Sequence, residues 1–265
     1  QDLELGRDAD TGGQTKYVVD LARALGDRAE IDRVDLVTRR ILDQAVSPDY
    51  AIPIEPLSAK ARIVRIDAGP ESYLPKEQLW DHLDVLVDNL HEWLREQGPW
   101  PDLIHSHYAD GGYVGLRLSR LLGVPLVHTG HSLGRDKRQR LLAAGMDGEE
   151  IDRRYNMLRR IEAEEETLAT ADLVITSTHN EIEEQYDLYD YYQPNRMVVI
   201  PPGTDLTQFR PPAAGEPSCD FASEVDRFYD EPTKPLILAL SRADPRKNIA
   251  SLVQAFGESV ELQAL

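Results

Sequence analysis

The chain has 265 residues, of which 41% are hydrophobic, and this length allows one large domain or two smaller ones with a buried core. Its formal net charge of -18 argues against nucleic acid or an anionic membrane as a partner, because both need broad basic faces. One cysteine, Cys219, excludes an intramolecular disulfide and a multi-cysteine zinc site, and the sequence contains neither a membrane-spanning run nor a signal-peptide core, so we expect a cytoplasmic protein.

The first predicted element is a helix that opens at a pair of glycines. Residues 8–26, DADTGGQTKYVVDLARALG, place Gly12 and Gly13 before a run of apolar residues at helical spacing. A Gly-rich turn at a helix N-terminus exposes backbone N–H groups that can receive a phosphate, although the same residues also suit a simple flexible entry to a helix. The stretch before it, LELGRDADTGGQ, resembles a strand-to-helix loop for which this sequence contains no preceding strand.

Short apolar runs then alternate with amphipathic stretches, which predicts βαβ units. Parallel strands joined by crossover helices form a doubly wound sheet whose ligands bind at the carboxyl ends of the strands. We therefore expect an α/β fold with a Rossmann-like, doubly wound parallel sheet. Strands are expected at 102–105, 124–130, 171–177 and 197–203, with helices at 113–123 and 181–189.

The last part of the chain changes in character. Residues 205–234 lack apolar periodicity and are rich in proline and acidic residues, and KPLILALSRADPRKNIASLVQAF at 234–256 then predicts a strand, a basic loop and a helix. The expected organisation is a first domain at 1–210, a linker at 211–233 and the start of a second domain at 234–265. One strand and one helix cannot close a core, so this second domain is incomplete.

Four histidines, His105, His107, His128 and His131, fall around two successive strand ends. They raise the question of a metal site, but lone histidines are more often packed or hydrogen-bonded, and the H-E-x-x-H pattern is absent. We expect no metal. His131 lies past its strand, at the crevice, and is the histidine expected to contact a substrate.

A basic stretch, HTGHSLGRDKRQR at 128–140, stands out in so acidic a chain. Arg and Lys form charge-assisted hydrogen bonds with phosphate, whereas the alternative is ordinary ion pairing on a helix surface. We favour surface ion pairs for Arg138 and Arg140 and a phosphate role for Lys137, which is nearest the loop. A second basic loop, SRADPRKN at 241–248, has the chemistry to hold a pyrophosphate, or is simply solvated.

Together these segments resemble the sucrose-phosphate synthase group of retaining GT-B glycosyltransferases, of the family 4 type. The resemblance runs along almost the entire chain, through DTGGQTKYV, YLPKEQLW, HSHYADGG, HTGHSLGRDK, RRIEAEE, VITSTHNEIEEQY, IPPGTD and SRADPRKN in that order. It implies a nearly complete N-terminal, acceptor-binding domain of Rossmann-like form. The C-terminal nucleotide-sugar-binding domain is only begun, because the family's E-x7-E element is missing, and the donor half belongs to the same or another chain.

The resemblance also implies an activity, the transfer of glucose from UDP-glucose to fructose 6-phosphate with retention at the anomeric carbon, giving sucrose 6-phosphate. No cofactor is expected, and the expected partners are these two small molecules. Lys76, Lys137 and one arginine of the pair Arg159 and Arg160 would hold the acceptor's phosphate. The implied site residues are Gly12, Gly13, Arg242 and Lys247 for the donor, Gln14, Lys76, Asp110, His131, Ser132, Lys137, Arg159 and Arg160 for the acceptor, and His131, Arg242 and Lys247 at the reaction centre.

Three alternatives stay open at this point. One is a related glycosyltransferase with another pair of sugars, such as a mannosylfructose-phosphate synthase that uses GDP-mannose. Another is a non-catalytic phosphosugar-binding module, which the chain satisfies as written. A metal-dependent hydrolase is a distant third. If the resemblance to the sucrose-phosphate synthase group holds, the chain alone is not expected to be an efficient synthase, because most of the donor half is missing.

Overall fold

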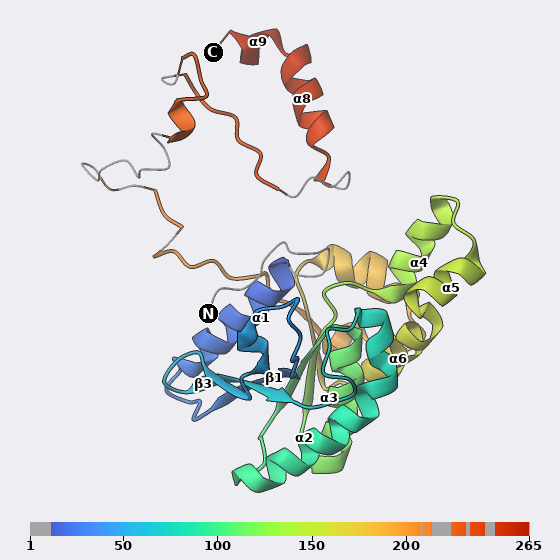
Figure 1. The fold of residues 1–265 in the computed structure, drawn as a ribbon. Coiled ribbons are helices and arrows are strands. Elements are labelled where there is room, and N and C mark those ends of the chain that lie inside the picture. Colours follow the sequence, from blue (N-terminus) through green and yellow to red (C-terminus); the bar gives the residue numbers. More distant parts are fainter. Residues whose placement is uncertain are drawn as a thin grey trace. The chain divides into compact units, whose positions relative to one another are not determined.

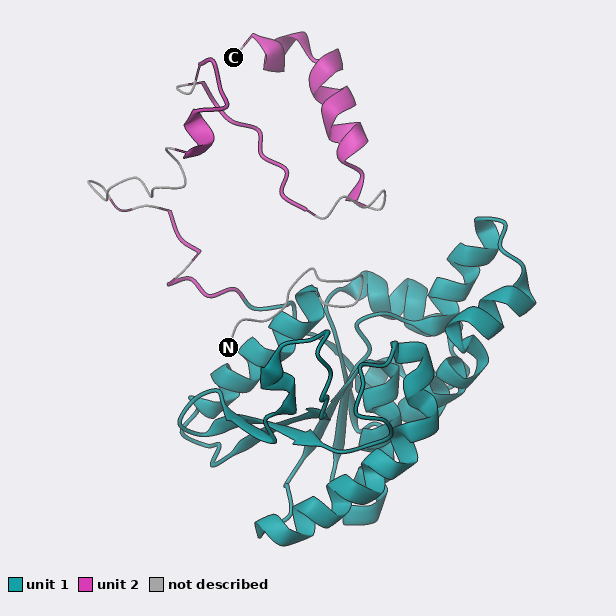
Figure 2. Ribbon diagram, in the orientation of Figure 1, with its two compact units in different colours: residues 1–203 teal, residues 204–265 magenta. Residues whose placement is uncertain are grey.

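The chain divides into two units, residues 1–203 and residues 204–265 (Figure 2). The computed structural model describes residues 12–207, 209–211, 213, 224–231, 234–241 and 247–264. The expected linker at 211–233 lies within the second unit. Among the residues described, no helix is long and apolar enough to cross a membrane.

The first unit holds two sheets (Figure 1). One has the order β1-β3-β2, in which β1 pairs in parallel with β3 and β2 pairs antiparallel to it. The other has the order β4-β5-β6-β7, and all of its pairs are parallel, as the alternating pattern predicts. The strands are β1 (Val34–Arg39), β2 (Ile54–Pro56), β3 (Ala61–Ile66), β4 (Ile104–His107), β5 (Leu126–Thr129), β6 (Leu173–Thr176) and β7 (Met197–Val199).

Helices cover both faces of these strands. Helices α1 and α2 both contact β3, in which every residue but Arg62 is buried, and α3 contacts β4, β5, α2 and α6 (Figure 1). The longer helices are α1 (Gly13–Gly26), α2 (Leu83–Gln97), α3 (Tyr108–Leu122), α4 (Gly134–Ala143), α5 (Gly148–Tyr155) and α6 (Met157–Thr170). Short helical turns are η1 (Pro48–Ala51), η2 (Lys76–His82), η3 (Glu181–Gln185), η4 (Tyr186–Leu188) and η5 (Pro194–Arg196).

Helix α3 lies unusually close to its neighbours. A Cβ atom on Gly115 would lie 2.8 Å from Cβ of Ser106 in β4, and one on Gly112 would lie 2.8 Å from Oγ1 of Thr167 in α6. Such distances leave no room for a side chain, so these glycines permit the helix to pack against the strand and against α6. This packing places the N-terminus of α3 directly at the carboxyl end of β4.

The second unit contains the helices α8 (Ile249–Glu258) and α9 (Val260–Gln263). The strand expected in KPLILAL is wrong, because residues 235–240 are described and form no strand. Their apolar side chains are exposed, Leu238 by 71% and Leu240 by 91%. A strand needs a partner for its backbone groups and an apolar surface for its side chains, and the described part of this unit offers neither.

Candidate substrate site

The candidate site lies where β4 and β5 end. His107 ends β4 and is followed by Tyr108 with a φ of 67°, and β5 is followed two residues later by His131 with a φ of 59°. Both are non-glycine residues in the left-handed region, a conformation that costs free energy and is concentrated at functional sites. The structure thus holds two strained residues just after the ends of two paired strands.

Three histidines form a contact chain at these strand ends. Nδ1 of His107 and Nε2 of His131 are 3.0 Å apart, and the ring of His107 lies 4.2 Å from that of His105. The ring of Tyr17, from α1, meets both His107 and His131 edge-on, with centroid distances of 6.1 Å and 5.3 Å. His131 therefore lies against His107 and the α1 residue Tyr17 at these strand ends, and its contact with a substrate stays a prediction.

Two further hydrogen bonds join histidines of these strands to neighbouring strand residues. Nε2 of His105 lies 2.9 Å from Oγ1 of Thr129, and Nδ1 of the buried His128 lies 2.9 Å from Oγ of Ser106. Every one of the four histidines therefore has a protein hydrogen-bond partner, as the packed interpretation predicts. The described residues contain no group of three or more His, Cys, Asp or Glu side chains that could hold a metal ion.

The protonation of these histidines follows from their surroundings. Burial lowers the pKa of His105 and His131 to about 4 and that of His128 to about 3. Burial, with repulsion from the neighbouring histidines, lowers the pKa of His107 to about 2. The cluster is neutral at pH 7, so it can exchange hydrogen bonds with a hydroxyl group but supplies no positive charge for a phosphate.

Positive charge gathers next to the histidines, in a small hollow that we call the cation pocket. Nζ of Lys76 and Cζ of Arg160 lie 5.7 Å and 4.7 Å from the ring centre of Tyr108, which follows His107. Nζ of Lys137 lies 3.8 Å from the ring centre of Tyr155. The pocket is lined by Lys76, Glu77, Trp80, Tyr108, Asp110, Tyr155 and Arg160.

An acidic group also reaches this pocket. Asp110, in the first turn of α3, accepts a hydrogen bond from the backbone N–H of Gly111 at 2.8 Å. Burial raises the pKa of its carboxyl, while that hydrogen bond and the cations Arg160 and Lys76 oppose the rise. A carboxyl beside two cations suits the recognition of a ligand that carries both hydroxyl groups and a phosphate.

The two neighbouring arginines of α6 contact different parts of the structure. Arg160 is 4% exposed, lines the cation pocket and donates to the backbone oxygen of Ser132 at 2.6 Å. Arg159 instead binds Asp81 and the backbone oxygen of Trp80, at 2.6 Å and 2.9 Å, and so ties α6 to η2. Of the two, Arg160 is the one that the structure brings to Lys76 and Asp110.

A buried carboxylate, which sequence reasoning missed, holds Arg160 in place. Glu164 is 3% exposed and accepts from Nε of Arg160 at 2.9 Å, from the hydroxyl of Tyr189 at 2.5 Å and from the backbone N–H of Gly134. This one side chain therefore positions both the arginine and the start of α4, the helix that carries Lys137. The available signal was its spacing, four residues after Arg160 on a face with Ala163 and Thr167.

The three arginines of the 128–140 stretch are engaged in ion pairs. Arg138 binds Asp152 at 3.0 Å and Arg140 binds Asp136, so the surface interpretation of these two is confirmed. Arg135 binds Glu165 and Asp190. Lys137 lies over the ring of Tyr155, which lines the cation pocket.

The residues implied for the donor belong to both units. Gly12 and Gly13 stand at the N-terminus of α1, as predicted, and are followed by Gln14, which the resemblance implies for the acceptor. Lys247 is exposed in the second unit, just before α8, and Arg242 falls outside the described residues. The donor roles of these four residues stay predictions.

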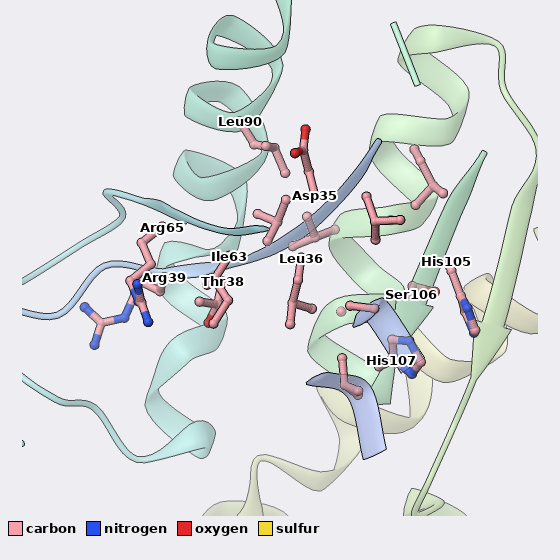
Figure 3. Close-up of a pocket in the computed structure, with 18 of the residues that line it drawn as sticks. Asp35, Leu36, Thr38, Arg39, Ile63, Arg65, Leu90, His105, Ser106 and His107 are labelled. Atoms are coloured by element: carbon pink, nitrogen blue, oxygen red, sulfur yellow. The ribbon is translucent and has the colours of Figure 1, made fainter. Parts of the chain in front are cut away.

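A larger cavity of about 730 Å³, the central cleft, lies between β1 and β4 (Figure 3). Its lining includes Gln14, His107 and Asp110, so the cleft opens to the same strand ends as the site. Asp110 lines both the central cleft and the cation pocket. The two hollows are thus neighbours at one edge of the fold.

Comparison with known proteins gives consistent matches. The family model of Glycosyltransferase Family 4 matches residues 11–208. The chain is 42% identical to the probable sucrose-phosphate synthase 2 of Arabidopsis thaliana and to the probable sucrose-phosphate synthase of Solanum tuberosum, over 100% of this chain and 31% of each relative. It therefore spans about a third of the length of these relatives.

Solved structures agree. The sucrose-phosphate synthase of Thermosynechococcus elongatus, 29% identical, matches with a TM-score of 0.69 over 94% of this chain and 55% of that one. HepE of Anabaena in complex with UDP-glucose, 16% identical, matches with a TM-score of 0.53 over 97% of this chain and 57% of its own. The second match concerns the fold alone, and both fit an α/β, GT-B arrangement of parallel strands and helices.

Proposed function

The chain belongs to Glycosyltransferase Family 4, and from that premise we propose that it is the acceptor-binding part of an enzyme that transfers glucose from UDP-glucose to fructose 6-phosphate. The products are sucrose 6-phosphate and UDP, with retention at the anomeric carbon of glucose. The bond from the glucose C1 to the UDP oxygen breaks, a bond from C1 to the anomeric oxygen of fructose forms, and the proton of that hydroxyl goes to the leaving phosphate. The catalytic activity belongs to a longer protein, since this chain spans 31% of its relatives.

The observation that carries the proposal is the pairing of a neutral histidine cluster with an adjacent cation pocket. Arg160 and Lys76, with Lys137 beside Tyr155, provide the charge that a sugar phosphate needs. His131 and its partner His107 provide uncharged hydrogen-bonding groups for the sugar hydroxyls. A glycosyl acceptor that carries a phosphate matches both halves of this site.

The donor would lie against the N-terminus of α1. Among the described residues, apart from chain neighbours and the backbone of α1 itself, no heavy atom lies within 4 Å of the position that a Cβ would take on Gly12 or Gly13, so these residues leave that backbone open to approach. The exposed N–H groups and the positive end of the helix favour the diphosphate of UDP-glucose. Arg242 and Lys247 are proposed to neutralise that diphosphate as it leaves, which lowers the barrier of a reaction that develops positive charge on the sugar.

Calorimetric titration of the chain tests the acceptor half of the proposal. We expect fructose 6-phosphate to bind and fructose to bind far more weakly, because only the former engages the cation pocket. Lys137→Ala should weaken the binding of fructose 6-phosphate by about 10-fold or more, since a hydrogen bond to a charged group contributes about 1.5–3 kcal/mol. Arg140→Ala, which removes an ion-paired cation from the same helix, should leave the affinity unchanged.

Two results would count against the proposal. Equal affinities for fructose and fructose 6-phosphate would show that the cation pocket does not bind the phosphate of the acceptor. Equal losses from Lys137→Ala and Arg140→Ala would show a general effect of charge. In the full-length enzyme, release of UDP that depends on fructose 6-phosphate tests the transfer itself, and binding without any transfer would favour a phosphosugar-binding module.

A further inference from the structure

Buried side chains from other parts of the chain fix the loop between β5 and α4. Three backbone N–H groups of residues 130–135 donate hydrogen bonds to side-chain oxygens whose residues are at most 3% exposed. The acceptors are Tyr186 for Gly130, Glu164 for Gly134 and Tyr189 for Arg135, at 3.2 Å, 2.9 Å and 3.1 Å. A buried backbone donor needs such a partner, so these bonds define where the loop lies.

Two glycines of the loop permit this close approach. A Cβ atom on Gly130 would lie 2.5 Å from the hydroxyl oxygen of Tyr186, and one on Gly134 would lie 2.7 Å from Oε2 of Glu164. Any other residue would push these acceptors away from the backbone. The glycines in HTGHSLGR therefore allow side chains from later in the chain to reach the loop.

Helix α4 has no capping side chain of its own. Its N-cap residue, Leu133, makes no side-chain hydrogen bond, and the first N–H groups of a helix have no partner inside it. Glu164 and Tyr189 satisfy the N–H groups of Gly134 and Arg135 instead. A carboxylate also complements the positive end of the helix dipole. The cap of α4 thus comes from α6 and from the residue that follows η4.

This cap is the main anchor of α4. Gly134 is the only buried residue of the helix, all ten residues of which are described. Lys137 lies in the first turn, where its N–H donates to the backbone oxygen of Leu133 at 3.0 Å. The position of the Lys137 side chain therefore depends on where the capped end of α4 is held.

Tyr189 joins this cap to the arginine of the cation pocket. Its hydroxyl accepts from the N–H of Arg135 and donates to Glu164 at 2.5 Å, and Glu164 also accepts from Nε of Arg160 at 2.9 Å. Burial and the nearby carboxylate raise the pKa of Tyr189, so its hydroxyl keeps the proton that it donates. A continuous path of hydrogen bonds thus connects Arg160 with the helix that carries Lys137.

We propose that Tyr189 is a positioning residue of the acceptor site, whose hydroxyl holds the start of α4 against Glu164 so that Lys137 and Arg160 bind one phosphate together. This inference rests on the proposed function, because it requires the acceptor's phosphate to contact both cations. Tyr186 provides a natural comparison. Its buried hydroxyl accepts from the same loop, at Gly130 ahead of α4, but it is not bonded to Glu164.

The test compares Tyr189→Phe with the matched control Tyr186→Phe. Each substitution keeps the ring and removes one buried hydroxyl bonded to a backbone N–H of the loop. In calorimetric titrations Tyr189→Phe should weaken the binding of fructose 6-phosphate by about 5-fold, less than Lys137→Ala does. Tyr186→Phe should keep the parent ratio of the affinities for fructose 6-phosphate and fructose. Urea unfolding of both variants shows that they are folded.

A double-mutant cycle separates positioning from a general structural effect. When Lys137 is already Ala, Tyr189→Phe should lower the affinity for fructose 6-phosphate by about twofold or less, because there is no lysine to position. A loss of the full size in both backgrounds would show that Tyr189 does not act through Lys137, and the proposal would be wrong. Equal losses of the affinity ratio from Tyr189→Phe and Tyr186→Phe would lead to the same conclusion.

A measurement without any sugar keeps this test separate from that of the proposed function. Nζ of Lys137 lies 3.8 Å from the ring centre of Tyr155, so the ring shifts the NMR signals of the neighbouring Cε protons. This shift should shrink in Tyr189→Phe and persist in Tyr186→Phe. An unchanged shift in Tyr189→Phe would overturn the proposal. Equal affinities of the parent chain for fructose and fructose 6-phosphate would instead contradict the proposed function, while the shift would still show whether Tyr189 positions Lys137.

Discussion

Leucines in similar apolar runs differ completely in solvent exposure between the two units of this chain. Leu116, in α3 of the first unit, is 0% exposed, whereas Leu240, in the predicted strand of the second unit, is 91% exposed. Both belong to apolar runs next to strand-to-helix loops, so the local sequence does not distinguish them. What differs is the neighbourhood, since α3 packs on β4, β5 and α6. A strand and a helix in sequence become a structure only where other elements complete the core.

The largest predicted effect compares two ion pairs. Glu164→Ala should destabilise the first unit by about 3–5 kcal/mol, because it leaves Arg160 charged and buried without its carboxylate. Glu224→Ala removes the partner of Arg227 in the second unit, where both side chains are more than 60% exposed, and should change stability by less than about 1 kcal/mol. Urea unfolding of the two variants measures both. Similar losses of unfolding free energy in the two variants would mean that burial does not make the ion pair of the first unit more important than that of the second.

The second prediction compares the two leucines directly. Leu116→Ala should cost about 2–5 kcal/mol of unfolding free energy, since it opens a cavity between α3 and its neighbours. Leu240→Ala should stay within about 0.5 kcal/mol of the parent chain, because the side chain is already in solvent. The midpoint and slope of urea unfolding check this pair, and a large loss for Leu240→Ala would reveal a core that its 91% exposure does not indicate.

The same neighbourhood effect decides what could be predicted from the sequence. Strands in VPLVHTG and ADLVITS were predicted correctly, since β5 and β6 lie inside those ranges. Helix α3 begins at Tyr108, earlier than the predicted start at residue 113. The prediction was late because Gly111 and Gly112 are residue types typical of loops. Gly112 is required where the helix approaches Thr167 and His128. The strand in KPLILAL was wrong because apolar content alone does not supply a neighbouring strand.

The residues of the site likewise divide into those that the sequence predicted and one that it did not. A phosphate role was predicted for Lys137 from its place after the loop, and the family resemblance added Lys76 and one arginine of the pair Arg159 and Arg160. The structure brings Lys76, Lys137 and Arg160 to two tyrosines that line one pocket. Glu164 was missed because it stands in EAEEE, which reads as a solvated acidic run, and only the packing of α6 against α3 and α4 buries it. The spacing from Arg160 was the one local signal, and it does not distinguish a buried ion pair from a solvated one, since the other partners of Glu164, Tyr189 and Gly134, lie far away in the chain.

A third prediction concerns pH and the buried His128. Its pKa is about 3 in the folded protein and about 6.5 when unfolded, so the unfolded chain binds a proton that the folded protein does not. The stability from keeping this ring neutral is fully present above pH 6.5 and is lost as the pH falls toward 3, at about 1.4 kcal/mol per pH unit. His128→Gln should therefore make unfolding free energy less steep between pH 6 and 4.

The control for this pH experiment is His179→Gln, which changes an exposed histidine. Its unfolding free energy should follow the parent chain at every pH, including the contribution of the acidic residues that both proteins share. A parent-like slope in His128→Gln would mean that burial of this ring contributes nothing to the acid sensitivity of the first unit.

The smallest effect compares two helix caps. Asp147 accepts from the backbone N–H of Glu150 at the start of α5, and Ser259 accepts from that of Leu262 at the start of α9. Asp147→Ala should cost about 0.5–2 kcal/mol of unfolding free energy, because α5 packs on α4 and α6 and its cap is part of that cooperative structure. Ser259→Ala removes an equivalent bond from a four-residue helix with no buried residue, so the global unfolding curve should not move. Equal shifts would show that α9 unfolds together with a core, and the contrast between the two regions would then reflect exposure alone and not cooperativity.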